Sequence, residues 1–447
     1  MIFSTFGVVL LKILVLSSLY NLAKGKKFEE SPDYASTNPL YLSRTMSFAK
    51  RYKPVDIGIG APNFAPPDFM REAFINVSLS PDYAVHQYTR SEGHPRLVKI
   101  LSKIYSPLVN RELDPFDNFV VSIGATNSIF CALQSLTHDS DDEWIVFEPH
   151  WEHYTAMIKM AGAKVKEVPL KPKKDKYSSG DSPSSSDWTF DRKKLRKAFG
   201  KKTRGVVLNN PNNPTGKVFN REELTFIADL VKKWDVIALV DEVYEWLVYG
   251  GHQHIRFASL PGMFERTITV GAATKTYSVT GWRVGWAYGP AYLMNYMKKS
   301  IFGAIGDNVT PSQEAVAIGL ERVWAERSRA NSYLVRYPKK LQIKRDRLVR
   351  ALCKAGFVTH VPESGYFLLA NWTGMKSLPS YLVGNTTDSK KDVEFVKYLV
   401  KEVGLEVYPG SPYFGEKHQS KGSDFVRVCF VKTDGTLNKA VDILTNL

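Results

Sequence analysis

Residues 275–286 read Lys-Thr-Tyr-Ser-Val-Thr-Gly-Trp-Arg-Val-Gly-Trp, and this stretch decides which fold to look for. It places Lys275 shortly before Arg283 among small, hydroxylated and glycine residues. A lysine amine forms Schiff bases with carbonyl cofactors. An arginine guanidinium presents a rigid fork that matches phosphate oxygens. Pyridoxal 5'-phosphate (PLP) carries both an aldehyde and a phosphate, so the pair predicts this cofactor.

The length and composition indicate a globular protein with two subdomains. A chain of 447 residues can bury a large core, and 44% hydrophobic with 23% charged residues is an ordinary balance. The formal net charge is +15, but lysines and arginines are scattered, which argues against a nucleic-acid partner. The cysteines Cys131, Cys353 and Cys429 form no CxxC pair, so no metal or redox motif is expected.

Residues 1–27 form an apolar segment that we expect to target or anchor the protein and to lie outside the fold. Lys12 interrupts the apolar run, lysines follow it, and no arginine or acidic residue occurs within it. This pattern leaves open a signal peptide, a mitochondrial presequence and a membrane anchor. We expect a cytoplasmic or mitochondrial protein whose membrane contact, if any, is confined to residues 1–27.

Seven β-branched runs alternate with helical patterns between residues 74 and 290, which predicts a largely parallel sheet covered by helices. Several runs are apolar at consecutive positions, as in strands buried on both faces. Helical patterns such as Arg221–Lys233 lie between most of them. The predicted strands are Phe119–Ile123, Glu143–Phe147, Lys164–Val168, Gly205–Asn209, Val236–Val240, Thr267–Val270 and Val284–Tyr288.

The remainder of the chain predicts a second, smaller α/β domain. Lys171–Asp187 is rich in Ser, Lys and Asp and is typical of an exposed loop. One long helical pattern runs from about Pro311 through Leu352, and Phe357–Leu447 mixes strands and helices. We expect residues 28–69 to form an N-terminal arm and part of the small domain, residues 70–325 the large PLP-binding domain, and residues 326–447 the C-terminal small domain.

Three further motifs lie at predicted strand ends, where open α/β sheets bind ligands. Ile123-Gly-Ala-Thr-Asn-Ser128 opens a helix, so the amides of Ala125 and Thr126 can hold a phosphate, although an ordinary strand–turn–helix explains it equally well. Asn209-Asn-Pro-Asn-Asn-Pro-Thr-Gly216 is a rigid turn that can aim the Asn213 amide at the phenolic oxygen of PLP.

The third motif, Leu239-Val-Asp-Glu-Val-Tyr244, ends a strand with a carboxylate. Asp241 can keep the pyridine nitrogen protonated, which makes the ring an electron sink, but it can equally be a helix N-cap. Tyr244 can reach the same phenolic oxygen as Asn213. Near the C-terminus, Arg427 interrupts the hydrophobic strand Phe425–Phe430, where it either faces solvent or binds a substrate carboxylate bidentately.

Together these motifs resemble the class I/II aminotransferases of PLP fold type I, and most of all the kynurenine aminotransferase group, also called glutamine transaminase K or cysteine-S-conjugate β-lyase. The resemblance covers about residues 34–447. It is carried by Asn38-Pro-Leu40, Gly60-Ala-Pro-Asn-Phe64, His86-Gln-Tyr-Thr89, Pro211-Asn-Asn-Pro-Thr-Gly-Lys-Val-Phe219, Asp241-Glu-Val-Tyr-Glu-Trp246, Tyr249-Gly-Gly-His-Gln-His-Ile255 and Ala258-Ser-Leu-Pro-Gly-Met263.

The resemblance implies a homodimer and a role for each matched residue. Lys275 matches the Schiff-base lysine, Asp241 the partner of the pyridine nitrogen, and Asn213 with Tyr244 the partners of the phenolic oxygen. Arg283 matches a phosphate-binding base, and Tyr88 a tyrosine that reaches the phosphate across the dimer interface. Trp151 matches the aromatic residue that stacks on the cofactor ring. The substrate-binding residues implied are Gly60, Asn213 and Arg427.

The implied function is transfer of the amino group of kynurenine, glutamine, methionine or an aromatic amino acid to a 2-oxo acid such as 2-oxoglutarate, with cysteine-S-conjugate β-lyase activity as a side reaction. The chain departs from the family pattern at Ala272, where a serine is usual, and at Thr126, Leu40, Gly306 and Asp307, where larger ring-bearing residues are usual. Two alternatives therefore stay open: an aminotransferase for aliphatic amino acids without kynurenine activity, and a catalytically silent binding protein.

Overall fold

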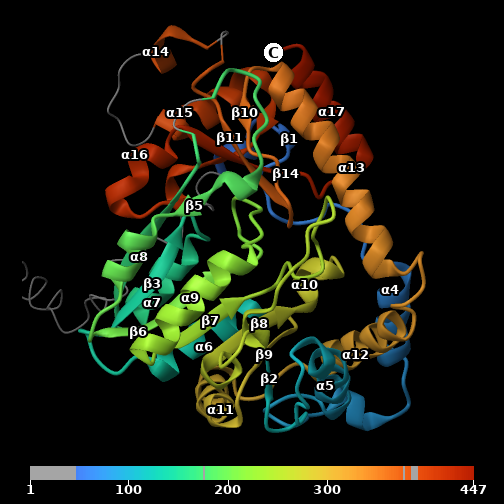
Figure 1. The fold of residues 1–447 in the computed structure, drawn as a ribbon. Coiled ribbons are helices and arrows are strands. Elements are labelled where there is room, and N and C mark those ends of the chain that lie inside the picture. The colour runs from blue at the N-terminus through green and yellow to red at the C-terminus, as the bar shows by residue number, and fades with distance from the viewer. Residues whose placement is uncertain (1–46, 175–176, 376–377, 384–390) are drawn as a thin grey trace, which may run out of the picture.

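The computed structural model describes residues 47–174, 177–375, 378–383 and 391–447, and Figure 1 shows how their helices and strands are arranged. The large sheet has eight strands in the order β2-β9-β8-β7-β6-β3-β4-β5. Strand β9 is antiparallel to both neighbours and β5 to β4, whereas the other neighbours are parallel. The strands are β2 Phe119–Ser122, β3 Glu143–Glu148, β4 Lys164–Lys171, β5 Thr189–Phe190, β6 Thr203–Asn209, β7 Ile237–Asp241, β8 Thr267–Ala272 and β9 Gly285–Tyr288.

The seven predicted strands are confirmed, and the structure adds β5 at one edge of the sheet. Two residues are too few to give a periodic pattern, so the sequence carries no signal for β5. The expectation for Lys171–Asp187 is wrong at its ends. Lys171 closes β4, and Ser185 is fully buried at the start of a short 3₁₀ helix, Ser185–Asp187.

Helices cover both faces of the large sheet, which explains the apolar runs. In β3, Trp144 and Val146 pack with α6, α7 and α11, whereas Ile145 and Phe147 pack with α8 and α9 on the opposite face. Helices α5 and α12 cover the β2–β9 end of the sheet. These helices are α5 Pro95–Leu108, α6 Ala125–Leu136, α7 His153–Met160, α8 Arg192–Ala198, α9 Arg221–Trp234, α11 Ala291–Ile305 and α12 Thr310–Ala325, and α4 Asp68–Ser78 packs on α12.

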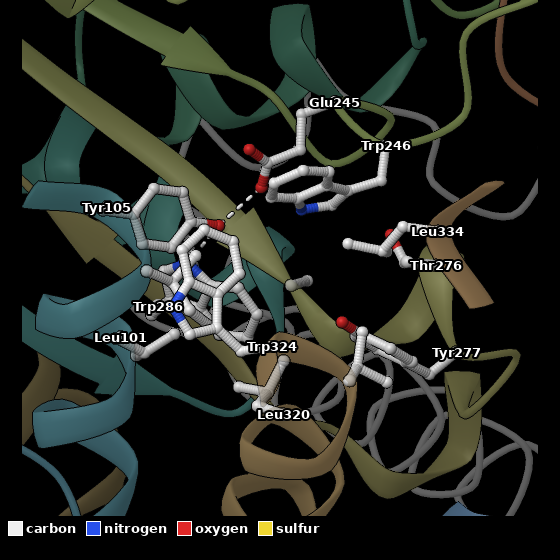
Figure 2. A pocket seen from close by; sticks show the side chains of 13 residues that line it. Leu101, Tyr105, Glu245, Trp246, Thr276, Tyr277, Trp286, Leu320, Trp324 and Leu334 are labelled. Carbon is white, nitrogen blue, oxygen red and sulfur yellow. Dashed lines mark hydrogen bonds between the residues drawn. The ribbon is translucent and has the colours of Figure 1, made fainter. Parts of the chain in front are cut away.

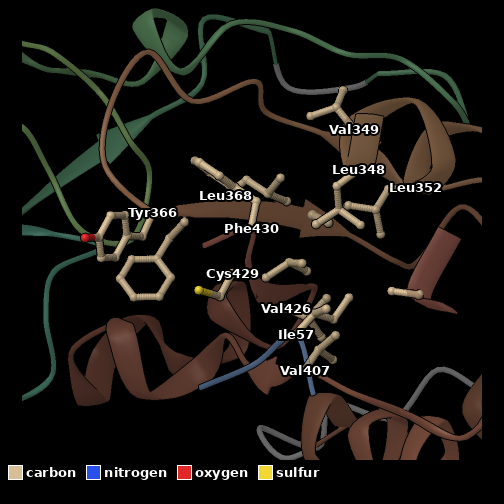
Figure 3. Close-up of a cluster of buried hydrophobic side chains, with 14 of the residues drawn as sticks. Ile57, Leu348, Val349, Leu352, Tyr366, Leu368, Val407, Val426, Cys429 and Phe430 are labelled. Carbon is tan, nitrogen blue, oxygen red and sulfur yellow. The ribbon is translucent and has the colours of Figure 1, made fainter. Parts of the chain in front are cut away.

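A second sheet is antiparallel and has the strand order β10-β11-β14-β13. Helices α13 and α17 lie side by side against it (Figure 1). Ile57, which follows β1, packs with Leu368 and Val426 in the same apolar core (Figure 3), so the N-terminal arm joins the C-terminal third. The elements are β1 Val55–Asp56, β10 Val358–Thr359, β11 Phe367–Asn371, β12 Leu405–Glu406, β13 Tyr408–Pro409, β14 Phe425–Cys429, α13 Tyr333–Lys354, α14 Ser380–Val383, α15 Lys391–Tyr398, α16 Gln419–Gly422 and α17 Asp434–Thr445.

The single long helix predicted from Pro311 to Leu352 is wrong, because the structure has two helices there. Helix α12 ends at Ala325 and α13 begins at Tyr333. The intervening residues are mostly exposed and include no apolar residue that could continue the buried stripe.

The predicted segment 1–27 and Leu40 lie outside the described residues. Within the described ranges, no helix is both long and apolar enough to span a membrane.

Candidate functional site

The predicted site residues follow strand ends at one edge of the large sheet. Asp241 is the last residue of β7, and it pairs in register with Asn209, the last residue of β6. Ala272 closes β8, three residues before Lys275, and pairs with Gly285 of β9. Gly285 also pairs with Ser122, the last residue of β2, and α6 begins at Ala125 shortly after it. The start of α6 therefore lies near residues 273–283, which we call the lysine segment. The carboxyl ends of the parallel strands therefore bring these motifs together.

Lys275 lies on α10 (Ala273–Thr276), a helix of only four residues. The pKa of the Lys275 amine is lowered to about 8, and burial is the largest cause. The Arg427 and Arg283 cations act in the same direction, whereas Cys429 and Asp241 act against it. The Lys275 Nζ lies 5.7 Å from the ring centroids of both Tyr244 and Tyr366. A larger fraction of this amine is therefore neutral and nucleophilic near neutral pH than for an ordinary lysine.

Asp241 is a buried carboxylate held by two donors. The Tyr154 hydroxyl donates to Asp241 Oδ2 at 2.5 Å, and the Val243 amide donates to Oδ1 at 3.2 Å. Burial raises the pKa of Asp241, and the two hydrogen bonds act in the opposite direction. No helix begins after β7, so the structure does not use Asp241 as a helix N-cap. A buried acid of this kind is suited to a cationic partner.

Two polar atoms near Asp241 have no partner among the described residues. The Tyr244 hydroxyl and Asn213 Oδ1 are both buried without a hydrogen bond. The turn that carries Asn213 is fixed, because the backbone N–H of Asn213 donates to Asn209 Oδ1 at 2.6 Å. A buried polar group left unpaired costs about 1–3 kcal/mol. The Tyr244 hydroxyl can donate to a ligand oxygen such as the phenolic oxygen of PLP, whereas Asn213 would donate to the same oxygen through its side-chain Nδ2 and not through Oδ1.

The start of α6 forms a cradle with Arg283. No side chain caps α6, so the amides of Ala125 and Thr126 at its start have no partner among the described residues, whereas the Asn127 amide donates to the Gly124 carbonyl at 3.0 Å. Gly124 precedes them at φ +99°, and a Cβ there would lie 2.7 Å from Arg283 Nη2. A Cβ on Gly285 would lie 2.6 Å from the Ala125 nitrogen. The glycines thus allow a guanidinium and free amides to approach one another, an arrangement that suits a phosphate group.

Arg427 points into the protein and not to solvent. It is only 4% exposed, and its Cζ lies 3.9 Å over the Phe367 ring. Its Nη2 donates to the Gly58 carbonyl at 3.4 Å, whereas Nε is buried without a partner. A Cβ on Gly60 would meet Phe367 at 2.4 Å, so only glycine fits there. A buried guanidinium with unused donors beside a bare backbone suits a carboxylate ligand.

The segment that carries Gly58 is held by a partly buried group of ionisable side chains, Asp56, Lys432 and Glu406. Asp56 Oδ1 accepts hydrogen bonds from the amides of Gly58 and Ile59, both at 2.8 Å. Its other oxygen accepts from Lys432 Nζ at 2.7 Å, and Lys432 is 1% exposed. Glu406 faces Asp56 across the β1–β12 pair. Burial, and then the Asp56 charge, raise the pKa of Glu406 to about 7.

The remaining predicted residues have mixed surroundings. Trp151 follows β3 and packs edge-on against Tyr154, with 5.4 Å between ring centroids. Tyr88 is 87% exposed on the loop after a 3₁₀ helix, Tyr83–His86, and thus differs from the buried residues above. Asp307 is exposed between α11 and α12.

A separate pocket lies between the lysine segment and helices α5 and α12 (Figure 2). Its lining is mostly apolar, with several aromatic rings, and includes Ala272 and Thr276 but none of the predicted site residues. Its one charged side chain, Glu245, is already paired: the Tyr105 hydroxyl donates to one carboxylate oxygen at 2.5 Å, and Arg256 binds the other, also at 2.5 Å. We therefore do not assign this pocket to a substrate.

Sequence reasoning missed two tyrosines that contact the predicted site. Tyr154 binds Asp241, and Tyr366 donates to the Lys275 carbonyl oxygen. Tyr154 stands three residues after Trp151, so its place at the start of the helix that follows β3 was the available signal. Tyr366 precedes β11, far away in the sequence, and no local pattern singles it out.

Comparison with known proteins identifies the family. Residues 52–444 match the family model described as aminotransferase class I and II. The chain is 40% identical over 392 residues to human kynurenine–oxoglutarate transaminase 1, covering 88% of this chain and 92% of the relative. It is 38% identical over 437 residues to the Dictyostelium discoideum kynurenine–oxoglutarate transaminase, covering 94% and 97%.

Solved structures agree with the family model. Saccharomyces cerevisiae Bna3p superposes with a TM-score of 0.85 at 29% identity, covering 94% of this chain and 99% of that chain. Mycobacterium tuberculosis N-succinyldiaminopimelate aminotransferase gives a TM-score of 0.79, also at 29% identity, and covers 94% and 100%. The resemblance noted in the sequence, the α/β fold and the expectation of a transaminase are thus confirmed. The chain belongs to the aminotransferase class I and II family.

Proposed function

We propose that this aminotransferase uses PLP attached to Lys275 and takes kynurenine among its amino donors, with a 2-oxo acid such as 2-oxoglutarate as acceptor. The observation that carries the proposal is the Lys275 amine, whose pKa burial lowers to about 8. It stands with a buried carboxylate, unpaired buried oxygens and a buried arginine. The named transaminases at 38–40% identity support the choice of substrate.

The residues divide into groups that match the parts of PLP. Arg283 and the amides of Ala125 and Thr126 would hold the phosphate, and Trp151 would lie against the ring. Asn213 Nδ2 and the Tyr244 hydroxyl, which is buried and unpaired, would donate to the phenolic oxygen. Asp241 would face the ring nitrogen. Bound PLP supplies an aldehyde for attachment to an amine and a ring that withdraws electrons from the substrate Cα.

The side chains around the substrate then have distinct tasks. Arg427 and the bare backbone at Gly60 would bind the α-carboxylate, and Asn213 would contribute from the opposite side. This orients the Cα–H bond toward Lys275. The Nζ of Lys275 would remove the proton from Cα as a base and deliver it, as an acid, to the carbon that carries the aldehyde in free PLP, and a group with a pKa near the working pH does this best. Asp241 holds its negative charge in place throughout.

We further propose a homodimer, because Tyr88 is 87% exposed here and would reach the phosphate of a partner subunit.

We also retain the division into a 28–69 arm, a 70–325 large domain and a 326–447 small domain, and a cytoplasmic or mitochondrial location. β-Lyase activity toward cysteine S-conjugates follows from the same proton removal when the β-carbon carries a leaving group. Asp307 and Gly306, in place of larger rings, favour a second candidate, a preference for aliphatic donors.

Borohydride reduction of the PLP-loaded protein followed by peptide mapping tests the proposal. A phosphopyridoxyl group should appear on Lys275, and Lys275→Ala should fold, lack this label and lose transamination of kynurenine. Lys275→Ala turnover near the wild-type level without added amine would overturn the assignment. A wild type that is labelled and active on methionine but not on kynurenine would retain the cofactor assignment and select the aliphatic alternative.

A further inference from the structure

Three tyrosine hydroxyls contact three residues of the lysine segment, namely Lys275, Thr276 and Ser278. Tyr366 donates to the carbonyl oxygen of Lys275 itself. Tyr333 donates to the carbonyl oxygen of Thr276 at 2.7 Å. The Tyr337 hydroxyl lies 2.8 Å from Ser278 Oγ. Every one of these contacts comes from outside the large sheet.

The tyrosines belong to the elements around the second sheet. Tyr333 and Tyr337 are one turn apart on α13, with their rings stacked at 5.2 Å and 12°. Tyr333 also stacks on Tyr277, at 5.7 Å and 16°. Tyr366 is fully buried, and Figure 3 shows its hydroxyl pointing out of the apolar core toward the outside of the cluster. Its hydroxyl also interacts with that of Tyr337. The three tyrosines therefore form one contiguous group, joined by the stacked rings of Tyr333 and Tyr337 and by the hydroxyls of Tyr337 and Tyr366.

The lysine segment needs such support because it cannot hold its own geometry. Helix α10 has four residues and no side-chain N-cap, and the last carbonyls of a helix lack intrahelical partners. Ser278 follows at φ +55°, a left-handed conformation that is unfavourable for a non-glycine residue. External hydrogen bonds to Lys275, Thr276 and Ser278 fix this backbone where intrahelical bonds do not.

We propose that Tyr333, Tyr337 and Tyr366 are positioning residues that set where the Lys275 amine stands and couple it to α13 and β11. They act through the backbone of the lysine segment and Ser278 and not on the reacting atoms. The proposal rests on the proposed role of Lys275. It implies that a shift of α13 or β11 relative to the large sheet moves the lysine, so that proton transfer at the substrate Cα depends on how the two sheets are held together.

The test uses the PLP-loaded Tyr333→Phe/Tyr366→Phe double variant, which keeps both rings and removes two hydroxyls. We expect kcat for transamination to fall about 10- to 100-fold with KM changed by less than about twofold, because misplacement affects the chemical step. Hydrogen–deuterium exchange in residues 273–283 should rise, and the pH midpoint of the visible absorption of the bound cofactor should shift. Tyr337→Phe alone should give a smaller change in the same direction.

Tyr292→Phe is the matched control. Its hydroxyl makes the same type of bond, to the Glu265 carbonyl at 2.8 Å, but on the exposed surface of α11. It should leave kcat, the absorption midpoint and exchange in residues 273–283 unchanged. If the double variant does not fold, Tyr366→Phe carries the same measurements.

Two results would overturn the proposal. One is a double variant that only melts at a lower temperature while kcat and the absorption midpoint stay at wild-type values, since this shows a merely structural role. The other is a Tyr292→Phe protein with the same losses. A wild-type protein without cofactor absorption or transamination would instead refute the proposed function, so the two failures are distinguishable.

Discussion

The hydroxyl of Tyr154 donates a hydrogen bond to the carboxylate of Asp241 at 2.5 Å. Burial alone raises the pKa of Asp241, and this bond counteracts it. Tyr154 therefore helps Asp241 remain charged in a site where water does not stabilise the charge. Without the hydroxyl, the carboxylate keeps only the Val243 amide as a hydrogen-bond donor among the described residues.

Tyr154→Phe should slow Cα proton removal. A hydrogen bond to a charged group contributes about 1.5–3 kcal/mol, which corresponds to roughly 10- to 150-fold in rate if it acts fully in the transition state. Single-turnover kinetics with one amino donor measure the effect. In an Asp241→Asn background the second substitution should add little, because the charge it supports is gone. Independent, additive losses would show that Tyr154 acts elsewhere.

The capture of PLP by the cofactor-free protein should depend on pH through Lys275. Only the neutral amine attacks an aldehyde, and burial lowers its pKa to about 8. The rate of appearance of visible absorption should rise about tenfold per pH unit below 8 and level off above 8. An ordinary lysine amine in a blocked amino acid, with a midpoint near 10.4, provides the comparison. A midpoint near 10 in the protein would show that Lys275 is solvated like a surface lysine.

Arg427→Ala should raise KM for every amino donor, since all donors carry the α-carboxylate. Loss of a buried charge pair costs about 2–5 kcal/mol. Arg427→Lys keeps the charge but loses the fork, so it should recover only part of the affinity. Steady-state kinetics across several donors decide the matter. A loss confined to one donor would mean that Arg427 recognises side chains.

Asp307→His should shift the preference between donors. An aromatic pair contributes roughly 0.5–1.5 kcal/mol beyond burial, so kcat/KM for kynurenine and phenylalanine should gain about two- to tenfold over methionine and glutamine. The wild-type carboxylate should disfavour aspartate by repulsion. A panel of these five donors checks both points. A wild type that takes aspartate best, or that strongly prefers kynurenine, would show that other residues build the pocket.

Glu406→Gln should stabilise the protein at pH 8 and have little effect at pH 4.5. Burial raises the pKa of Glu406 to about 7 in the folded chain, from 4.5 in the unfolded one. The folded state therefore prefers the protonated acid, and the stability this gives is complete below about 4.5 and lost as the pH rises through 7. Thermal melts of both proteins across this range provide the measurement. If the melting temperatures of the wild type and of Glu406→Gln differ by the same amount at every pH, Glu406 stays charged on folding.

The strands were predictable because their residues are apolar on both faces. Phe119–Ile123 and Thr267–Val270 agree with β2 and β8 within two residues at each end. The break between α12 and α13 was not predictable, because no glycine or proline marks it. A helical pattern interrupted by polar residues looks continuous until packing places Ala325 and Tyr333 in different helices.

For the site, too, some residues could be predicted from neighbouring sequence, whereas the roles of others depend on residues far away in the chain. Lys275, Asp241 and Asn213 stand in short motifs at strand ends, which a sequence displays directly. The side toward which Arg427 points depends on Gly58 and Phe367, which are distant in the chain, so alternation along β14 left both directions open. The contact of Tyr366 with the lysine segment could not be predicted from the sequence, because a buried tyrosine beside a strand usually only packs in the core.

The bond from Arg427 to the Gly58 carbonyl joins residues that are 369 positions apart. During synthesis, the large sheet can form once β9 has left the ribosome, with Lys275 already in its segment. The carboxylate site cannot exist until β14 has emerged and paired with β11. A nascent chain thus passes through a stage that can hold a cofactor phosphate but has no means of selecting an amino acid.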